Sequence, residues 1–131
     1  MYKATVTCTD HKTYHATGNH LAFDMGHDAE GASPIDVLLA SLCGCISHYV
    51  GIFLDREAIA FEAFEVGANC MPSADNIDLG RISVDIHVQA QGAALSASAK
   101  EALCSFVTQC RVYRSLGAST RVKIRADQES A

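Results

Sequence analysis

Apolar and polar residues alternate along the first part of the chain. This pattern predicts three short β-strands, over residues 3–9, 13–17 and 20–23. In the first strand Ala4, Val6 and Cys8 share one face, so we expect this strand to be half-buried. Residues 24–32 contain two glycines and several acidic residues, which predicts a loop.

A long apolar run then predicts a helix that starts after Ser33 and extends to about residue 54. Ser33 is a favourable N-cap, and Pro34 suits the first helical position. Asp36 lies three residues after the cap, where its carboxylate can accept a hydrogen bond from the cap's backbone amide. The charged residues 55–57 end the helix at the surface.

This helix approaches the length of a membrane span. However, it contains Ser41, Ser47 and His48, and acidic residues rather than basic anchors flank it. We therefore expect a core helix that is covered on most sides, and no membrane association.

The second half of the chain predicts two strands, a helix and a final strand. Residues 61–70 alternate with one shift of register, and residues 81–89 form the cleanest alternating strand. Ser98 and Glu101 form a second capping box, followed by an apolar stripe that includes Cys110 and excludes Cys104. Residues 120–126 predict the last strand, with Val122 and Ile124 facing inward. The predicted class is α+β, with antiparallel sheets packed on helices in a single domain over residues 1–131.

Composition narrows the function classes. The chain has 131 residues, a formal net charge of -5 and no basic cluster, which argues against nucleic acid or an anionic membrane as a partner. The residues after Met1 alternate and do not form the apolar core of a signal peptide. The six cysteines are irregularly spaced, so we expect free thiols in a reducing cytoplasm rather than a disulfide framework.

The chemistry must then come from the thiols. Cys45 lies deep in the first helix and Cys110 on the core stripe of the second, so helix packing could bring the two together. A reversible disulfide needs Cα atoms within about 7 Å, and from spacing alone simple packing is the commoner role. A zinc site at Cys43, Cys45 and His48 is disfavoured, because residues two apart on a helix point to different faces. We expect no metal and no cofactor.

Two motifs contain these thiols. One is Ser-Pro-x-Asp-x-Leu-Leu-Ala-Ser-Leu-x-Gly-Cys, from Ser33 to Cys45. The other is Cys110 followed closely by the pair Ser115-Leu116. Both motifs resemble those of the OsmC/Ohr family, the osmotically induced and organic hydroperoxide resistance proteins. The order of predicted elements also resembles the family over nearly the whole chain.

The resemblance implies an intertwined homodimer with two central helices, and a peroxiredoxin-like organic hydroperoxide reductase with an antioxidant role. It implies that Cys45 attacks the peroxide and becomes a sulfenic acid, and that Cys110 then forms a disulfide with it. An external dithiol, in the family often a lipoylated protein, would regenerate both thiols. The alternative is an OsmC-like dimer that binds a small hydrophobic or electrophilic ligand in its inter-subunit cleft, with little peroxidase activity.

Activation of the thiol is where the sequence departs from the family. A peroxidatic cysteine must ionise, which burial opposes, and the resemblance implies an arginine from the N-terminal strands held by a glutamate of the first motif. Here Asp36 replaces the glutamate, and the first arginine in the chain is Arg56. His20 is a candidate substitute, and Arg111 and Arg114 beside Cys110 are others.

Overall fold

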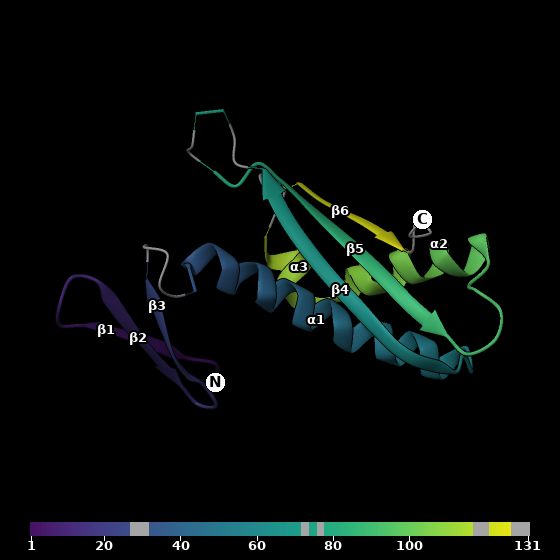
Figure 1. Cartoon of the computed structure of the whole chain (residues 1–131), viewed down its shortest axis with the longest axis horizontal. Helices are drawn as coiled ribbons and strands as arrows, with labels where there is room; N and C mark the ends of the chain where they lie inside the picture. Colours follow the sequence, from purple (N-terminus) through teal and green to yellow (C-terminus); the bar gives the residue numbers. More distant parts are fainter. Residues whose placement is uncertain (27–31, 72–73, 76–77, 117–120, 127–131) are drawn as a thin grey trace. The chain divides into compact units, whose positions relative to one another are not determined.

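The computed structural model describes residues 1–26, 32–71, 74–75, 78–116 and 121–126. The chain divides into two compact units, Met1–Leu39 and Ala40–Ala131, which we call the N-terminal unit and the C-terminal unit. Because the division falls inside a helix, the single domain over residues 1–131 stays a prediction. The structure confirms the α+β class: it contains two three-stranded sheets together with helices (Figure 1).

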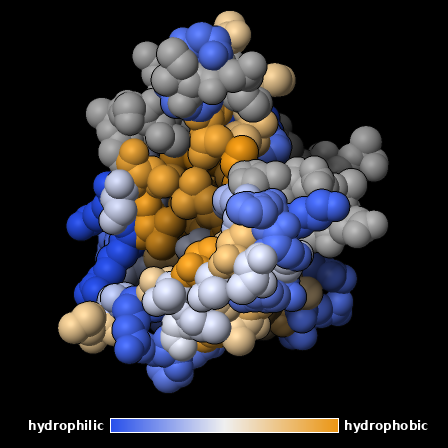
Figure 2. All heavy atoms as spheres, turned by 90° about the vertical axis from the view of Figure 1, so that its left-hand side faces the viewer, coloured by the Kyte–Doolittle hydropathy of each residue, from blue (hydrophilic) through white to orange (hydrophobic). Residues whose placement is uncertain are grey.

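The N-terminal unit contains an antiparallel sheet in the order β1-β2-β3. Its strands are β1 (Ala4–Cys8), β2 (Thr13–Gly18) and β3 (Ala22–Gly26). Val6 pairs with Ala16, and Ala16 pairs with Phe23, so these three apolar side chains form a ladder on one face of the sheet. Phe23 and Val6 are 36% and 51% exposed, and every residue of β1 is exposed. The prediction that β1 is half-buried is therefore wrong for a single chain. Figure 2 shows that hydrophobic residues are open to solvent on the face of the molecule drawn there.

The third strand begins two residues later than predicted. The Gly18 N–H donates to the Leu21 carbonyl at 3.0 Å, which closes the turn before β3 and leaves His20 inside that turn. Asp24 belongs to β3 and not to a loop, and it accepts a hydrogen bond from His15 Nδ1 at 2.6 Å across the strand pair. The rest of the predicted loop, residues 27–31, lies outside the described residues.

Helix α1 (Pro34–Arg56) begins as the sequence predicts. The Asp36 N–H donates to Ser33 Oγ at 3.1 Å, and the Ser33 N–H donates to Asp36 Oδ2 at 3.2 Å, so the capping box is confirmed. At the other end the Ile59 N–H donates to the Leu54 carbonyl, and Ala58 adopts a left-handed φ of 52°. This is a Schellman cap in which alanine occupies the position that usually holds glycine.

Helix α1 is the one helix among the described residues that is long and apolar enough to cross a membrane. This property rests on length and composition alone, and the core helices of globular proteins share it. Five of its residues are buried within this chain: Leu42, Ile46, Val50, Phe53 and Leu54.

The C-terminal unit holds the second sheet, in the order β4-β5-β6. The strands are β4 (Phe61–Met71), β5 (Arg81–Ala90) and β6 (Arg121–Ala126). The alternation of β5 is confirmed, because its apolar residues are buried: Ile82, Val84, Ile86 and Val88. The predicted register shift in β4 is present, between Phe61 and Ala63.

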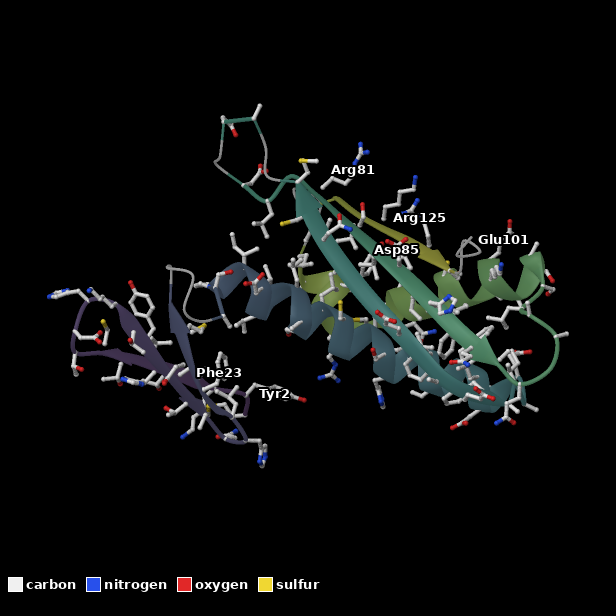
Figure 3. The ribbon with its side chains drawn as sticks, viewed as in Figure 1. Tyr2, Phe23, Arg81, Asp85, Glu101 and Arg125 are labelled. Atoms are coloured by element: carbon white, nitrogen blue, oxygen red, sulfur yellow. The ribbon has the colours of Figure 1, made fainter. Side chains whose placement is uncertain are left out.

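The predicted antiparallel pairing holds for β4 with β5, whereas β6 pairs with β5 in parallel. On the solvent face the Arg125 guanidinium of β6 donates to Asp85 of β5 at 2.9 Å (Figure 3). In β6, Val122 and Ile124 are half-buried and Ala126 is buried, in line with the predicted inward face.

The helical region after β5 differs from its prediction. Helix α2 (Ala97–Phe106) is capped by Ser96, whose hydroxyl accepts from the Ala99 N–H at 3.1 Å, so Ser98 is not the cap. The helix ends at Phe106, and a 3₁₀ turn η1 (Val107–Gln109) and a short helix α3 (Arg111–Ser115) follow. Cys110 is therefore not part of one continuous helical stripe. Gly117, Thr120 and the predicted tail lie outside the described residues.

Aromatic side chains join α1 to α2. The Phe106 ring lies 6.1 Å from that of Tyr49 and 5.8 Å from that of Phe53, measured between ring centroids. The Arg56 guanidinium lies over the same ring, 5.3 Å from its centroid. These contacts fix the end of α2, and with it the η1 turn that leads to Cys110.

Candidate redox site

The thiols of Cys45 and Cys110 lie close enough to influence each other, because a side-chain hydrogen bond with Cys45 and the charge of Cys45 both raise the pKa of Cys110. Cys45 comes from α1 and is half-buried, whereas Cys110 follows η1 and is 0% exposed. Both residues belong to the C-terminal unit. The structure therefore brings together the two thiols that the sequence singled out, and both are free.

Cys110 occupies the N-cap position of α3. Its backbone is extended, with φ -53° and ψ 128°, and its Sγ accepts a hydrogen bond from the Tyr113 N–H at 3.3 Å. The Val112 backbone N–H also acts on this sulfur, since it lowers the pKa of the Cys110 thiol. A side-chain hydrogen bond also links α3 to η1, because Arg114 Nε donates to the Thr108 carbonyl at 3.3 Å.

The surroundings of Cys110 raise the pKa of its thiol above the ordinary value. Burial is the largest cause, and the hydrogen bond with Cys45 and the charge of Cys45 act in the same direction. The backbone N–H groups of Tyr113 and Val112 act in the opposite direction. At neutral pH Cys110 therefore keeps its proton and presents an S–H donor to the Cys45 sulfur.

Two other predicted site residues belong to the N-terminal unit. His20 is exposed in the turn before β3, and Asp36 is exposed and engaged in the cap of α1. Their proposed catalytic roles stay predictions. His48 of α1 is exposed, and its ring lies edge-on to that of Tyr49, with 5.4 Å between the ring centroids.

The remaining thiols have different surroundings. Burial raises the pKa of Cys43 and of Cys104, both half-buried. Cys8 is exposed and Cys70 is half-buried at the end of β4. Within the described residues no group of three or more His, Cys, Asp or Glu side chains is placed to hold a metal ion.

The backbone donors to Cys110 were not expected from the sequence. Helix N-caps are recognised by Ser, Thr, Asp or Asn, and a cysteine at that position gives no such signal. A main-chain N–H is also carried by almost every residue type, so only the break between α2 and α3 could have revealed it. The residue pattern placed Cys110 in a helix interior, where its sulfur would lack these donors.

A family model described as OsmC-like protein matches residues 26–125. The chain belongs to the OsmC-like protein family. No curated protein matches this OsmC-like chain. The matched range includes both Cys45 and Cys110.

Solved structures share the fold over almost the whole chain. An OsmC-like protein from Mycoplasma pneumoniae has a TM-score of 0.81 at 14% identity, covering 97% of this chain and 96% of its own. An organic hydroperoxide resistance protein OsmC from Legionella pneumophila has a TM-score of 0.72 at 15% identity, with 98% and 97% covered. The organic hydroperoxide resistance protein OhrB of Bacillus subtilis has a TM-score of 0.70 at 15% identity, with 97% and 98% covered. The predicted OsmC fold is thereby confirmed.

Proposed function

We propose that this OsmC-like protein is a cysteine-based thiol peroxidase that reduces organic hydroperoxides in the response to oxidative stress. The observation that carries the proposal is the hydrogen bond between the half-buried Cys45 thiol and the fully buried Cys110 thiol. A pair with one more accessible and one enclosed sulfur can divide the work of attack and resolution. Structural neighbours described as organic hydroperoxide resistance proteins support the substrate class.

In the proposed reaction the Cys45 thiolate attacks the terminal peroxide oxygen. An S–O bond forms as the O–O bond breaks, so that Cys45 becomes a sulfenic acid. The departing alkoxide takes up a proton, which balances the one that the Cys45 thiol released on ionising, and leaves as the alcohol. The Cys110 sulfur then attacks the Cys45 sulfur, the S–O bond breaks and water leaves. The hydrogen-bonded contact between the two thiols supports this step, because little movement is needed to form the S–S bond.

Activation of Cys45 draws on the S–H of Cys110. Because the pKa of Cys110 is raised, this residue holds its proton at neutral pH and can donate to the charged Cys45 sulfur. Arg111 and Arg114 are exposed cations next to Cys110 in the chain, and Arg114 Nε donates to the Thr108 carbonyl. We propose His20 and Asp36 as further contributors, with His20 in the place of the family's arginine.

We also propose that the protein is a homodimer. The ladder of Val6, Ala16 and Phe23 gives the N-terminal sheet an apolar face whose outer members, Val6 and Phe23, are open to solvent in one chain. On α1 the small residues Ala40 and Gly44 are exposed, and a Cβ built on Gly44 would meet no atom within 4 Å apart from its chain neighbours and the backbone of its own helix. A second copy would cover both surfaces, as an apolar helix requires.

Regeneration requires two thiols from outside the chain. We propose a small dithiol or a lipoylated protein as the reductant, acting in a reducing cytoplasm where free cysteines persist. An OsmC-like dimer that binds a small hydrophobic or electrophilic ligand in the inter-subunit cleft is the alternative, and it becomes the conclusion if peroxide turnover is absent.

The test measures consumption of dihydrolipoamide driven by cumene hydroperoxide. We expect turnover by the wild type and loss to the uncatalysed rate in Cys45→Ser, because serine cannot form a sulfenic acid. Cys43→Ser is the matched control, two residues away on the same helix, and should keep its activity. Wild type no faster than Cys45→Ser would overturn the peroxidase proposal. Equal losses in Cys43→Ser and Cys45→Ser would overturn the assignment of the nucleophile.

A further inference from the structure

The two sulfurs of the pair are unequally accessible and unequally surrounded by hydrogen-bond donors. Cys110 is 0% exposed, whereas Cys45 is half-buried. Cys110 Sγ already accepts a hydrogen bond from the Tyr113 N–H at 3.3 Å. When a disulfide joins these residues, an incoming thiolate can approach only the Cys45 side, because attack must occur along the S–S axis at an accessible sulfur.

We propose that the reductant attacks Cys45 Sγ and that Cys110 leaves as a thiolate received by the Tyr113 N–H, a step that rests on the proposed function. The Cys45–Cys110 S–S bond breaks, and its electron pair leaves with Cys110 Sγ. A new S–S bond joins Cys45 to the reductant. A second thiol of the reductant then attacks the reductant sulfur that is bound to Cys45, and Cys45 leaves as a thiolate. The reductant ends as a disulfide, and the protein has gained two electrons.

Formation of the mixed disulfide removes two of the causes that disfavour a Cys110 thiolate. Three causes raise the pKa of this thiol: burial, the hydrogen bond with Cys45 and the charge of Cys45. While Cys45 is held in a mixed disulfide it carries neither a charge nor a free sulfur, so the last two causes are absent. Burial alone then opposes the leaving thiolate, and the Tyr113 and Val112 N–H groups offset part of that cost.

The position of attack can be mapped on the unmodified chain. The protein is oxidised with diamide, treated briefly with millimolar glutathione, quenched in acid and alkylated, and its peptides are analysed by mass spectrometry. We expect glutathione on Cys45 and the alkyl group on Cys110. Glutathione on Cys110 would overturn the proposal.

The role of the donor is tested by replacing Tyr113 with its α-hydroxy acid, which exchanges the N–H for an ester oxygen. Loss of a hydrogen bond to a charged sulfur should slow reduction of the diamide-formed disulfide by about tenfold. Tyr113→Phe keeps the N–H and should be reduced at the wild-type rate. An ester variant that is folded by circular dichroism and reduced as fast as the wild type would overturn the donor's role.

These two experiments do not depend on peroxide. Diamide forms the disulfide and glutathione reduces it whether or not the protein is a peroxidase. A failed assay with cumene hydroperoxide would therefore remove the proposed function and leave the position of attack to be decided by the peptide map. Conversely, glutathione found on Cys110 would leave the peroxidase proposal in place.

Discussion

The two units of this chain are built from similar alternating strands, yet they bury them very differently. In the C-terminal unit, β5 has four fully or nearly fully buried apolar residues, Ile86 among them at 1% exposure. In the N-terminal unit, Ala16 is the one residue of the described sheet that reaches the same burial, and Val6 and Phe23 beside it are open. The same period-2 pattern thus produces a core in one unit and an uncovered face in the other.

The difference separates the apolar surface that a single chain buries from the apolar surface that it leaves open to solvent. A three-stranded sheet needs a covered apolar face to be stable in water, and the N-terminal sheet has the face without the cover. The redox pair lies entirely in the unit that has its own core. A rigid surrounding is what a pair of thiols needs in order to hold a hydrogen bond and then form a disulfide without large movement.

The largest expected effect comes from the buried face. Ile86→Ala should lower the free energy of unfolding by about 2–5 kcal/mol, because it removes buried methyl groups and leaves a cavity. Phe23→Ser, on the open face, should instead weaken the proposed dimer, raising its dissociation constant by about tenfold or more through lost apolar contact. Urea unfolding measures the first effect, and sedimentation at several protein concentrations measures the second.

Thr7→Ala is the control for Phe23→Ser, because Thr7 is exposed on the opposite face of the same sheet. It should leave the dissociation constant unchanged. A wild type that sediments as a monomer at micromolar concentration would contradict the dimer, and an unaltered dissociation constant in Phe23→Ser would place the interface elsewhere.

A smaller effect is expected at the start of α1, which crosses from one unit to the other. Ser33→Ala and Asp36→Ala each remove one side of the capping box and should cost about 1 kcal/mol of stability in thermal or urea unfolding. Asp36→Glu should restore it, because glutamate also reaches the cap amide.

The same variants separate capping from catalysis. If Asp36 contributes to activation of the thiol, Asp36→Ala should lose peroxide turnover beyond the loss in Ser33→Ala, which breaks the same cap. We expect this excess loss. Equal turnover in the two variants would make Asp36 a capping residue alone.

Local chemistry made much of the fold predictable from the sequence. The capping box of α1, the alternation of β5 and the register shift in β4 depend on neighbouring residues, and all are confirmed. The exposure of β1 was not predictable, because alternation indicates which face is apolar and not whether anything covers it. The parallel pairing of β6 depends on how the chain returns to the sheet, which periodicity does not encode.

The approach of the two thiols was predictable from the sequence, whereas the geometry around Cys110 was not. The spacing and the family resemblance singled out Cys45 and Cys110, and the structure brings them together. The break at Phe106 was missed, since the apolar stripe continues through Cys110 as if the helix did. As a result the Tyr113 N–H that contacts the buried sulfur appears only in the structure.

The smallest expected effect is on the pH dependence of stability. It distinguishes a thiol removed from solvent from a non-titrating residue of the same unit. Burial raises the pKa of Cys104, so the folded chain holds this proton more tightly than the unfolded chain. Its contribution to stability is therefore full below the ordinary thiol pKa of about 8.5 and declines as the pH rises from there toward the folded pKa.

The melting temperature of the reduced protein should fall between about pH 8 and pH 10, and it should fall less steeply in Cys104→Ala. The comparison concerns the slopes, so a difference in melting temperature between the two proteins at neutral pH does not affect it. Ser105→Ala, an exposed and non-titrating neighbour on α2, should keep the wild-type slope. Parallel curves for the wild type and Cys104→Ala would show that the thiol is as well solvated in the folded chain as in the unfolded one.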